Sequence, residues 1–179
     1  ITLRDTAGAV GSEVLSANGD VTFGSFTQLT ADTTVSTLGG DVNWQNTAVF
    51  SDAAGPHDLS IDTHGGNVQL GVFTNTDGVI AGTFVNNLTI DTTNGGISAG
   101  TLMLHGGITL ANNFQYALGG GTATFLNAAN SVLGVNSSIS TQGTGTVQIL
   151  ATFAGSDVAM QDGTFINTAG GNVTLQAAN

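Results

Sequence analysis

The stretch SIDTHGGNVQL at residues 60–70 contains the pattern that decides the fold. A hydroxyl residue, an aliphatic residue, a small polar residue and a threonine precede a Gly-Gly pair, and alternating polar and apolar residues follow it. Such alternation is typical of a β-strand with one buried face. Related copies begin at residues 34, 89 and 138, and looser copies lie around residues 15 and 166, so the pattern recurs along most of the chain.

The spacing of these copies indicates a repeat architecture. The aliphatic position of each copy is separated from the next by 20, 26, 29, 49 and 27 residues, counting along Leu15, Val35, Ile61, Ile90, Ile139 and Ile166. The interval of 49 spans two periods if Ala117, which lies just ahead of three glycines, takes the missing position. The mean period is then about 25 residues, which suits three short strands joined by turns.

Composition agrees with an all-β fold. The chain has 27 glycines and 40% hydrophobic residues, only 7% of its residues are charged, and strong helix formers are few. We therefore predict a right-handed parallel β-solenoid (β-helix) of about seven coils of roughly 25 residues. It spans residues 1–179 as a single solenoid segment, excised from or continuing into a longer repetitive chain. The Gly-Gly pairs are expected to supply positive φ angles at its corners.

Charge and cysteine content exclude several classes of function. Lys and Arg together number one, Arg4, against 12 acidic residues, which gives a formal net charge of −11. Nucleic-acid binding needs cationic side chains, so no nucleic-acid partner is expected. No apolar run is long enough to cross a bilayer, so no membrane insertion is expected. The absence of cysteine from the sequence excludes disulfides, zinc–thiolate sites and thiol nucleophiles.

The segment GGNVTL at residues 170–175, echoed at 19–23, 39–44 and 65–70, resembles the repeats of filamentous-haemagglutinin-like exoproteins and related giant β-strand-repeat bacterial surface proteins. The likeness covers nearly the whole chain. It implies a right-handed β-helix, secretion to the bacterial cell surface or the extracellular medium, and a role in attachment, matrix or surface extension. It carries over no catalytic residue.

We accordingly expect a structural or adhesive extracellular solenoid rather than an enzyme. Residues 172–179 joined to residues 1–3 continue the strand pattern, so the expected partners are other copies, or the continuation of the solenoid, stacked end to end. Cell-surface or matrix glycans are further candidate partners. We expect the connection at 45–58, with a turn at Pro56-His57-Asp58, to be the most irregular one and therefore the local binding feature.

Two alternative functions remain open at this point. Parallel β-helices include enzymes that bind or degrade polysaccharides, and Asp62 and Asp91 could satisfy the carboxylate spacing of a glycoside hydrolase. Against this, Arg4 is the only Lys or Arg, and Trp44 and Tyr116 are the only large amphipathic aromatic residues. An ice-binding solenoid would need Thr-x-Thr in register on every coil, but the motif is local to residues 122–124 and 144–146.

The candidate sites are few. We expect one stacked row of Ser36, Asp62, Asp91 and Ser140, and another of Asp20, Asp41 and Asn67. Asp62 with Asp91 is a candidate calcium site, since adjacent carboxylates repel unless a cation lies between them; the alternative is a pair of solvated turn residues bonded to local N–H groups. The histidines, His57, His64 and His105, match no metal signature and are interpreted as loop residues. No catalytic residue and no other cofactor is predicted.

Overall fold

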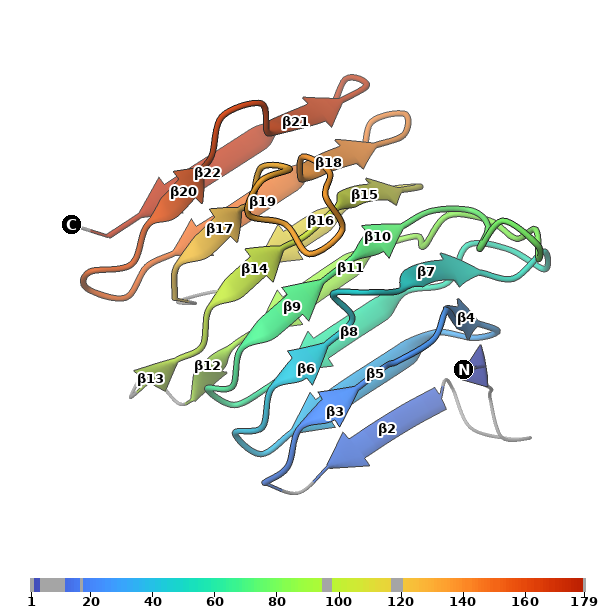
Figure 1. Cartoon of the computed structure of the whole chain (residues 1–179), viewed down its shortest axis with the longest axis horizontal. Helices are drawn as coiled ribbons and strands as arrows, with labels where there is room; N and C mark the ends of the chain where they lie inside the picture. The colour runs from blue at the N-terminus through green and yellow to red at the C-terminus, as the bar shows by residue number, and fades with distance from the viewer. Residues whose placement is uncertain (1, 4–11, 17, 95–97, 117–120, 179) are drawn as a thin grey trace.

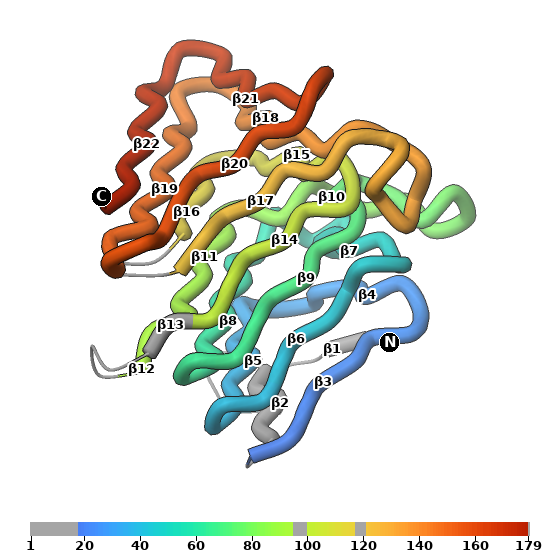
Figure 2. The backbone as a smooth tube through the Cα atoms, turned by 60° about the vertical axis from the view of Figure 1, so that its left-hand side comes forward, coloured from blue at the N-terminus to red at the C-terminus, as the bar shows by residue number. Residues whose placement is uncertain are grey.

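A computed structural model describes residues 2–3, 12–16, 18–94, 98–116 and 121–178 of the chain. The described residues form strands, turns and connections, with no helix among them. Three parallel sheets wind around one shared core, and the coils stack in chain order from the N-terminal to the C-terminal end (Figures 1 and 2). The predicted parallel β-solenoid is confirmed.

Each sheet takes one strand from successive coils. Sheet A is formed, in spatial order, by β1 (Thr2–Leu3), β4 (Thr27–Leu29), β7 (Ala48–Ser51), β10 (Val72–Phe73), β15 (Gly107–Leu110), β18 (Ser138–Thr141) and β21 (Phe165–Thr168). Sheet B is formed by β2 (Ser12–Ser16), β5 (Thr33–Thr37), β8 (Leu59–Asp62), β11 (Leu88–Asp91), β16 (Phe114–Tyr116), β19 (Val147–Ala151) and β22 (Val173–Ala177). Sheet C is formed by β3 (Val21–Thr22), β6 (Val42–Asn43), β9 (Val68–Leu70), β14 (Leu102–Leu104), β17 (Ala123–Phe125) and β20 (Val158–Met160).

The strands make six complete coils followed by β21 and β22, which begin a seventh. Along sheet B the register advances by 21, 26, 29, 26, 33 and 26 residues from one coil to the next. The coil length therefore varies around the predicted period, because the connections between strands differ in length. One such connection carries a short antiparallel ribbon of β12 (Thr93–Asn94) and β13 (Ser98–Ala99).

The register corrects part of the predicted repeat alignment. The sheet B row that contains the buried Ile61 runs through Val14, Val35, Ile61, Ile90, Tyr116, Ile149 and Leu175. Leu15 is thus one residue out of register, and Ala117 lies outside the described residues. Ile139 and Ile166 belong to sheet A, where they pair with each other.

The misalignment has a simple physical cause, because the Thr-x-Gly-Gly pattern marks a type of corner and not a particular side of the coil. In the earlier coils the Thr37 and Thr63 hydroxyls donate to the carbonyls of Gly40 and Gly66 between sheets B and C. In the later coils Thr141 makes the same bond to Gly145, but between sheets A and B. The same local sequence therefore closes two different corners.

The two glycines of a corner have different roles. The first has a positive φ, 101° at Gly39 and 103° at Gly65, as predicted. The second glycine needs no positive φ. Glycine is required there because a side chain would collide with the coil beneath it. A Cβ atom at Gly66 would lie 2.1 Å from the carbonyl oxygen of Gly40, and one at Gly40 would lie 2.0 Å from that of Gly19. Stacked glycines therefore allow the coils to approach closely at this corner.

The interior is a continuous column of aliphatic and aromatic side chains. Trp44 has no exposed surface, as its inward position predicts, and its ring stacks on Phe23 with a centroid distance of 4.1 Å. The indole Nε1 donates to the Thr27 hydroxyl at 3.0 Å, which satisfies its only polar group. The single polar group of this buried side chain is therefore paired inside the core.

Two long excursions, residues 74–87 and 126–137, fold against sheet A. Thr83 forms an antiparallel bridge with Ser51 of β7. Gly82 lies against the ring of Phe50, which is fully buried although it alternates with the core residue Val49 and so faces outward. The second excursion follows β17 and lies in front of the stack in Figure 1. Sheet A therefore has a partly covered outer face.

The prediction that residues 45–58 form the most irregular connection is wrong. Residues 48–51 are β7, which pairs with β4 and β10 in sheet A. The sequence AVFS does not alternate because Phe50 is buried under the first excursion, so the strand lacked the usual signal. The longer irregular connections are the two excursions.

Candidate functional site

Asp62 and Asp91 are register neighbours on β8 and β11, as predicted. Each carboxylate is engaged locally. Asp91 Oδ1 accepts hydrogen bonds from the backbone N and the hydroxyl of Thr93 at 2.8 and 2.6 Å. Asp62 Oδ1 accepts from His64 N at 3.3 Å and lies 3.0 Å from His64 Nδ1. Both residues thus have the bonds of turn aspartates, and calcium binding at this pair stays a prediction.

The rest of that predicted row is only partly right. Ser36 does pair with Asp62 in sheet B. Ser140 does not belong to this row: it lies in sheet A beside Thr109 and Asn167. This error follows directly from the change of corner described above.

The second predicted row is confirmed as a hydrogen-bond ladder at the corner that precedes sheet C. Asp41 N donates to Asp20 Oδ1 at 2.9 Å, and Asn67 N donates to Asp41 Oδ1 at 2.7 Å. Thr101 N continues the series to Asn67 Oδ1 at 3.0 Å. In each step the backbone of one coil bonds to the side chain of the preceding coil, so these hydrogen bonds connect successive coils.

A second ladder, which the sequence interpretation missed, precedes sheet B. Its successive members are bonded by backbone N–H to side-chain oxygen, in the order Asp32, Asp58, Asn87, Asn113 and Thr146. Amide side chains add to it: Asn87 Nδ2 donates to Asp58 Oδ1 at 2.8 Å, and Asn113 Nδ2 to Asn87 Oδ1 at 2.9 Å. The available signal was an Asp, Asn or Thr immediately before the first inward residue of each strand.

The histidines do not come together as one site. Among the residues that the structure describes, no group of three or more His, Cys, Asp or Glu side chains is placed to hold a metal ion. His57 lies in a connection, where Nε2 is 3.1 Å from Asp52 Oδ1. His64 adopts a φ of 49° in the turn after β8, and its Nδ1 lies 3.1 Å from the Thr37 carbonyl. Both agree with their interpretation as loop residues.

His105 differs from that interpretation because it is buried at the corner between β14 and β15. It is 4% exposed, and the hydroxyl of Ser131 in the second excursion donates to its carbonyl oxygen. Nε2 lies 3.2 Å from Gln69 Oε1, whereas Nδ1 is buried without a partner. Burial lowers the pKa of the imidazole. Glycines follow His105 in the sequence, which is typical of an exposed turn, but the second excursion covers this histidine.

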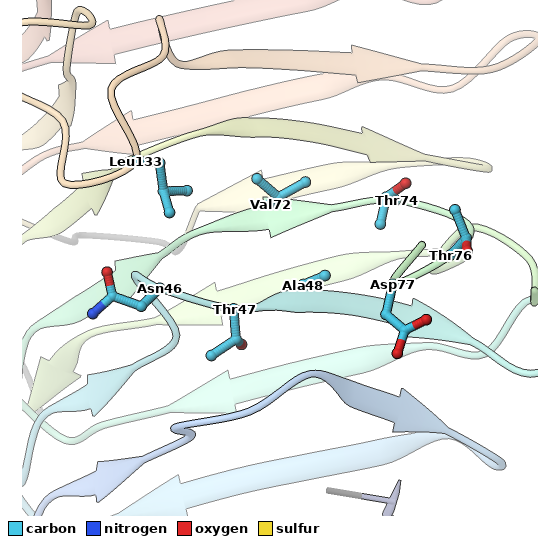
Figure 3. Close-up of a pocket in the computed structure, with 8 residues that line it drawn as sticks. All are labelled: Asn46, Thr47, Ala48, Val72, Thr74, Thr76, Asp77 and Leu133. Carbon is cyan, nitrogen blue, oxygen red and sulfur yellow. The ribbon is translucent and has the colours of Figure 1, made fainter. Parts of the chain in front are cut away.

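A depression of about 330 Å³ lies between the two excursions on sheet A (Figure 3). Its aliphatic part is formed by Ala48, Val72 and Leu133, and its polar part by Asn46, Thr47, Thr74, Thr76 and Asp77. Asp77 Oδ1 accepts the N–H groups of Ile80 and Val79 at 2.6 and 2.8 Å, and these bonds lower the pKa of its carboxyl group. The depression is thus bordered by one fixed carboxylate, neutral polar groups and aliphatic side chains.

Exposed aliphatic residues mark the excursions on either side of this depression. Val79 is 90% exposed, and Ile80 beside it is also exposed. In the second excursion Val132 and Val135 are exposed. Exposed aliphatic side chains are typical of a contact surface where they form a contiguous patch, whereas isolated ones are common on any protein surface. We call these four residues the aliphatic tips.

Tyr116 is a core residue and not part of an open site. Its hydroxyl lies 3.1 Å from Thr92 Oγ1, 3.1 Å from the Gly100 carbonyl and 3.0 Å from the Gly121 carbonyl. Burial, reinforced by the negative charge of Asp91 and opposed by hydrogen bonds, raises the pKa of Tyr116 to about 12. The phenol therefore remains a neutral donor that holds the corner between sheets B and C.

We expect this pKa to be measurable directly, because Tyr116 is the only tyrosine of the chain. Tyrosinate absorbance should appear near pH 12 in the folded protein and near the ordinary value of 10 in the urea-unfolded chain. Since the folded state holds the proton longer, the free energy of unfolding should fall by roughly 2–3 kcal/mol between about pH 10 and pH 12. Tyr116→Phe should remove this alkaline decline; a folded-state titration near 10 would contradict it.

The last described strand of each sheet, β20, β21 or β22, has no neighbour on one side, and inward residues of β20 and β22 are uncovered. Val173 and Leu175 are 45% and 46% exposed, whereas Val147 and Ile149, their register partners in the preceding coil, are fully buried. Met160 is likewise exposed while its partner Phe125 is buried. Among the described strands, this end of the solenoid presents an apolar face and strand edges without a neighbour.

Comparisons with known proteins identify no family for this fold and its surfaces: no family model, curated protein or solved structure matches the chain. In the part of the chain that the structure describes, no helix has the length and apolar character needed to cross a bilayer.

The Thr-x-Thr segments do not form an extended flat threonine face. Thr124 of β17 has Met103 and Ala159 as its register neighbours. Thr146 belongs to the second ladder, where its hydroxyl donates to Asn113 Oδ1 at 3.2 Å. These local surroundings differ from the repeated arrangement that ordering of ice would require.

Proposed function

We propose that the chain is a structural and adhesive solenoid of an extracellular bacterial surface protein, similar in role to filamentous-haemagglutinin-like exoproteins. The main support is that two sets of residues have different roles. Asp and Asn side chains such as Asp41, Asp58 and Asn87 bond coil to coil. The aliphatic tips, by contrast, are left in solvent beside the depression. A rigid stack that presents a local contact surface suits attachment better than catalysis.

The scarcity of cationic residues in the sequence indicates which partners such a scaffold would contact. Arg4 is the only Lys or Arg of the sequence, whereas the depression is bordered by a carboxylate. Anionic polymers would therefore be repelled. Neutral matrix glycans, or proteins with an exposed apolar patch, are the partners that the aliphatic tips and neutral polar groups fit best.

Adhesion is tested with beads coated with the purified chain, applied to a panel of neutral polysaccharides and to surfaces coated with extracellular-matrix proteins. We expect retention on at least one surface, and at least a tenfold loss of retention with the double change Val79→Ser and Val132→Ser. The matched control is Leu38→Ser, because Leu38 is another exposed aliphatic residue, 49% exposed, in the turn after β5. Equal retention of all three proteins would contradict the assignment of the contact surface.

The same polysaccharide panel separates adhesion from hydrolysis. An adhesive scaffold should release no reducing sugar over long incubation, with or without added Ca²⁺. Release of reducing sugar that is lost in Asp62→Asn or Asp91→Asn would instead support the polysaccharide-degrading alternative. Both substitutions preserve the side-chain oxygen that accepts the turn hydrogen bond, so loss of folding should not obscure the result.

A further inference from the structure

The imidazole of His105 is buried although it lies outside the core. Its Nε2 atom is 3.2 Å from Oε1 of Gln69. Gln69 alternates on β9 with Val68 and Leu70, which belong to the core, so its side chain faces outward from sheet C. Because His105 is only 4% exposed in this outer position, its cover has to come from a segment packed on the outside of the solenoid.

The second excursion supplies this cover. The Ser131 hydroxyl donates to the carbonyl oxygen of His105, and the Ser137 hydroxyl donates at 2.5 Å to the carbonyl oxygen of the residue before it. On the other side of His105, a Cβ atom at Gly106 would lie 3.0 Å from Cδ1 of Leu133. The excursion is therefore attached directly over the corner that holds the histidine.

Only the neutral form of His105 fits this environment. Because Gln69 Oε1 is an acceptor, Nε2 carries the imidazole proton, and Nδ1 is a buried acceptor without a partner. A second proton would turn Nδ1 into a buried donor with no acceptor beside it, which is costly in a protein interior.

The surroundings of His105 contain no group that would compensate this cost. The elements packed at the corner present Gln69 from β9, Val72 from β10, and Ser131 and Leu133 from the second excursion, and none of these side chains is titratable. Burial lowers the pKa of the imidazole, with no charge among the described residues to favour its protonated form. Water is the remaining acceptor, and it reaches Nδ1 only when the excursion moves away.

We propose that protonation of His105 opens the second excursion, so that the contact surface on sheet A is complete at neutral pH and dismantled in mild acid. This inference rests on the proposed adhesive function and adds its regulation. The excursion carries Val132 and Val135, two of the four aliphatic tips, and Leu133, which borders the depression. Its displacement would therefore remove one side of the surface while the first excursion stays in place.

The direction of the pH effect follows from the difference in proton affinity between the two forms. The closed form disfavours the imidazolium, whereas in the open form the imidazole is hydrated and titrates near its ordinary pKa of 6.5. The open form therefore binds the proton more readily. Closure is most favourable above about pH 6.5, and this advantage is lost progressively as the pH falls from about 6.5 through the lowered pKa of the closed form.

Hydrogen exchange measures the opening without any binding partner. The N–H of Ser137 is bonded to the Leu126 carbonyl at 2.8 Å across the base of the second excursion, and the N–H of Gly82 to the Asn75 carbonyl at 2.8 Å in the first. Relative to an unstructured amide at the same pH, Ser137 should lose protection severalfold between about pH 7.5 and about pH 5. Gly82 should keep its protection, because the lowered pKa of Asp77 leaves that carboxyl group ionised in this range. Equal behaviour of the two amides would overturn the proposal.

Substitution of the histidine tests its role in the opening. His105→Gln introduces a neutral side chain that can still donate to Gln69, so its Ser137 amide should stay protected at about pH 5. His57→Gln is the matched control, because His57 lies in another connection, and it should lose protection as the unmodified chain does. Loss of protection in His105→Gln would overturn the proposal. NMR titration of the unmodified chain needs no substitution: we expect His105 to titrate below 6.5, and a pKa at or above this value would likewise overturn it.

Retention of coated beads, on a surface that holds them at neutral pH, tests the consequence for attachment. We expect retention to fall severalfold from about pH 7.5 to about pH 5 for the unmodified chain and for His57→Gln, and to persist for His105→Gln. An equal loss in His105→Gln would overturn the proposed regulation. Failure of every surface to hold the beads at neutral pH would instead contradict the proposed function, while the exchange of Ser137 would still decide whether His105 controls the excursion.

Discussion

Gly66→Ala should destabilise the solenoid more than any surface substitution, by at least about 3 kcal/mol. The added methyl group would lie 2.1 Å from the carbonyl oxygen of Gly40, a backbone atom that cannot move without shifting the preceding coil. Urea unfolding followed by the fluorescence of Trp44, the only tryptophan, measures the effect.

Gly24→Ala is the matched control for this change. A Cβ atom at Gly24 would meet nothing within 4 Å, and the residue has no positive φ. Its free energy of unfolding should therefore change by less than about 1 kcal/mol. If Gly66→Ala were tolerated as well as Gly24→Ala, the close approach of stacked corners would be wrong.

The second large effect concerns Asn87, in the middle of the second ladder. Asn87→Ala removes the donor to Asp58 and the acceptor for Asn113 N and Nδ2. Because these groups are half buried, we expect a loss of about 1–3 kcal/mol in the free energy of unfolding. Asn46→Ala, which changes an exposed amide outside both ladders, should have little effect.

Asn87→Asp separates hydrogen bonding from charge. The new carboxylate keeps the acceptor for Asn113 but faces the carboxylate of Asp58 at the position where Nδ2 now donates. Repulsion would raise the pKa of the new carboxyl group above its unfolded value. The folded state would then bind a proton more readily, so the stability lost at neutral pH should be regained as the pH falls toward 4. A deficit independent of pH would contradict the ladder geometry.

The sequence allowed the solenoid to be predicted because its signals are local. Gly-Gly pairs, alternating strands such as Val68–Leu70 and the row Asp20, Asp41, Asn67 all depend on neighbours along the chain or one coil away. The assignment of each corner to a side of the coil could not be predicted in the same way. The patterns around Ile61 and Ile139 are alike, yet they lie on sheets B and A, because insertions between coils change how many strands separate successive copies.

The candidate surfaces were harder to predict because they depend on contacts between distant excursions. Phe50 faces outward and is buried only where residues 74–87 cover it, and the depression closes only where Leu133 approaches Val72. By contrast, the pairing of Asp62 with Asp91 was predicted correctly, since it follows from the repeat alone. Long-range packing of irregular segments leaves no comparable periodic signal.

The arrangement of the coils is the basis of every proposal made for this chain, and paired spin labels test it most directly. Ser60 and Thr89 are 29 residues apart in sequence but are register neighbours on the outer face of sheet B. Thr89 and Met103 are only 14 residues apart but lie on different sheets. Labels on cysteines at 60 and 89 should show strong dipolar broadening in the electron paramagnetic resonance spectrum, whereas labels at 89 and 103 should show much less. The opposite ranking would contradict the solenoid.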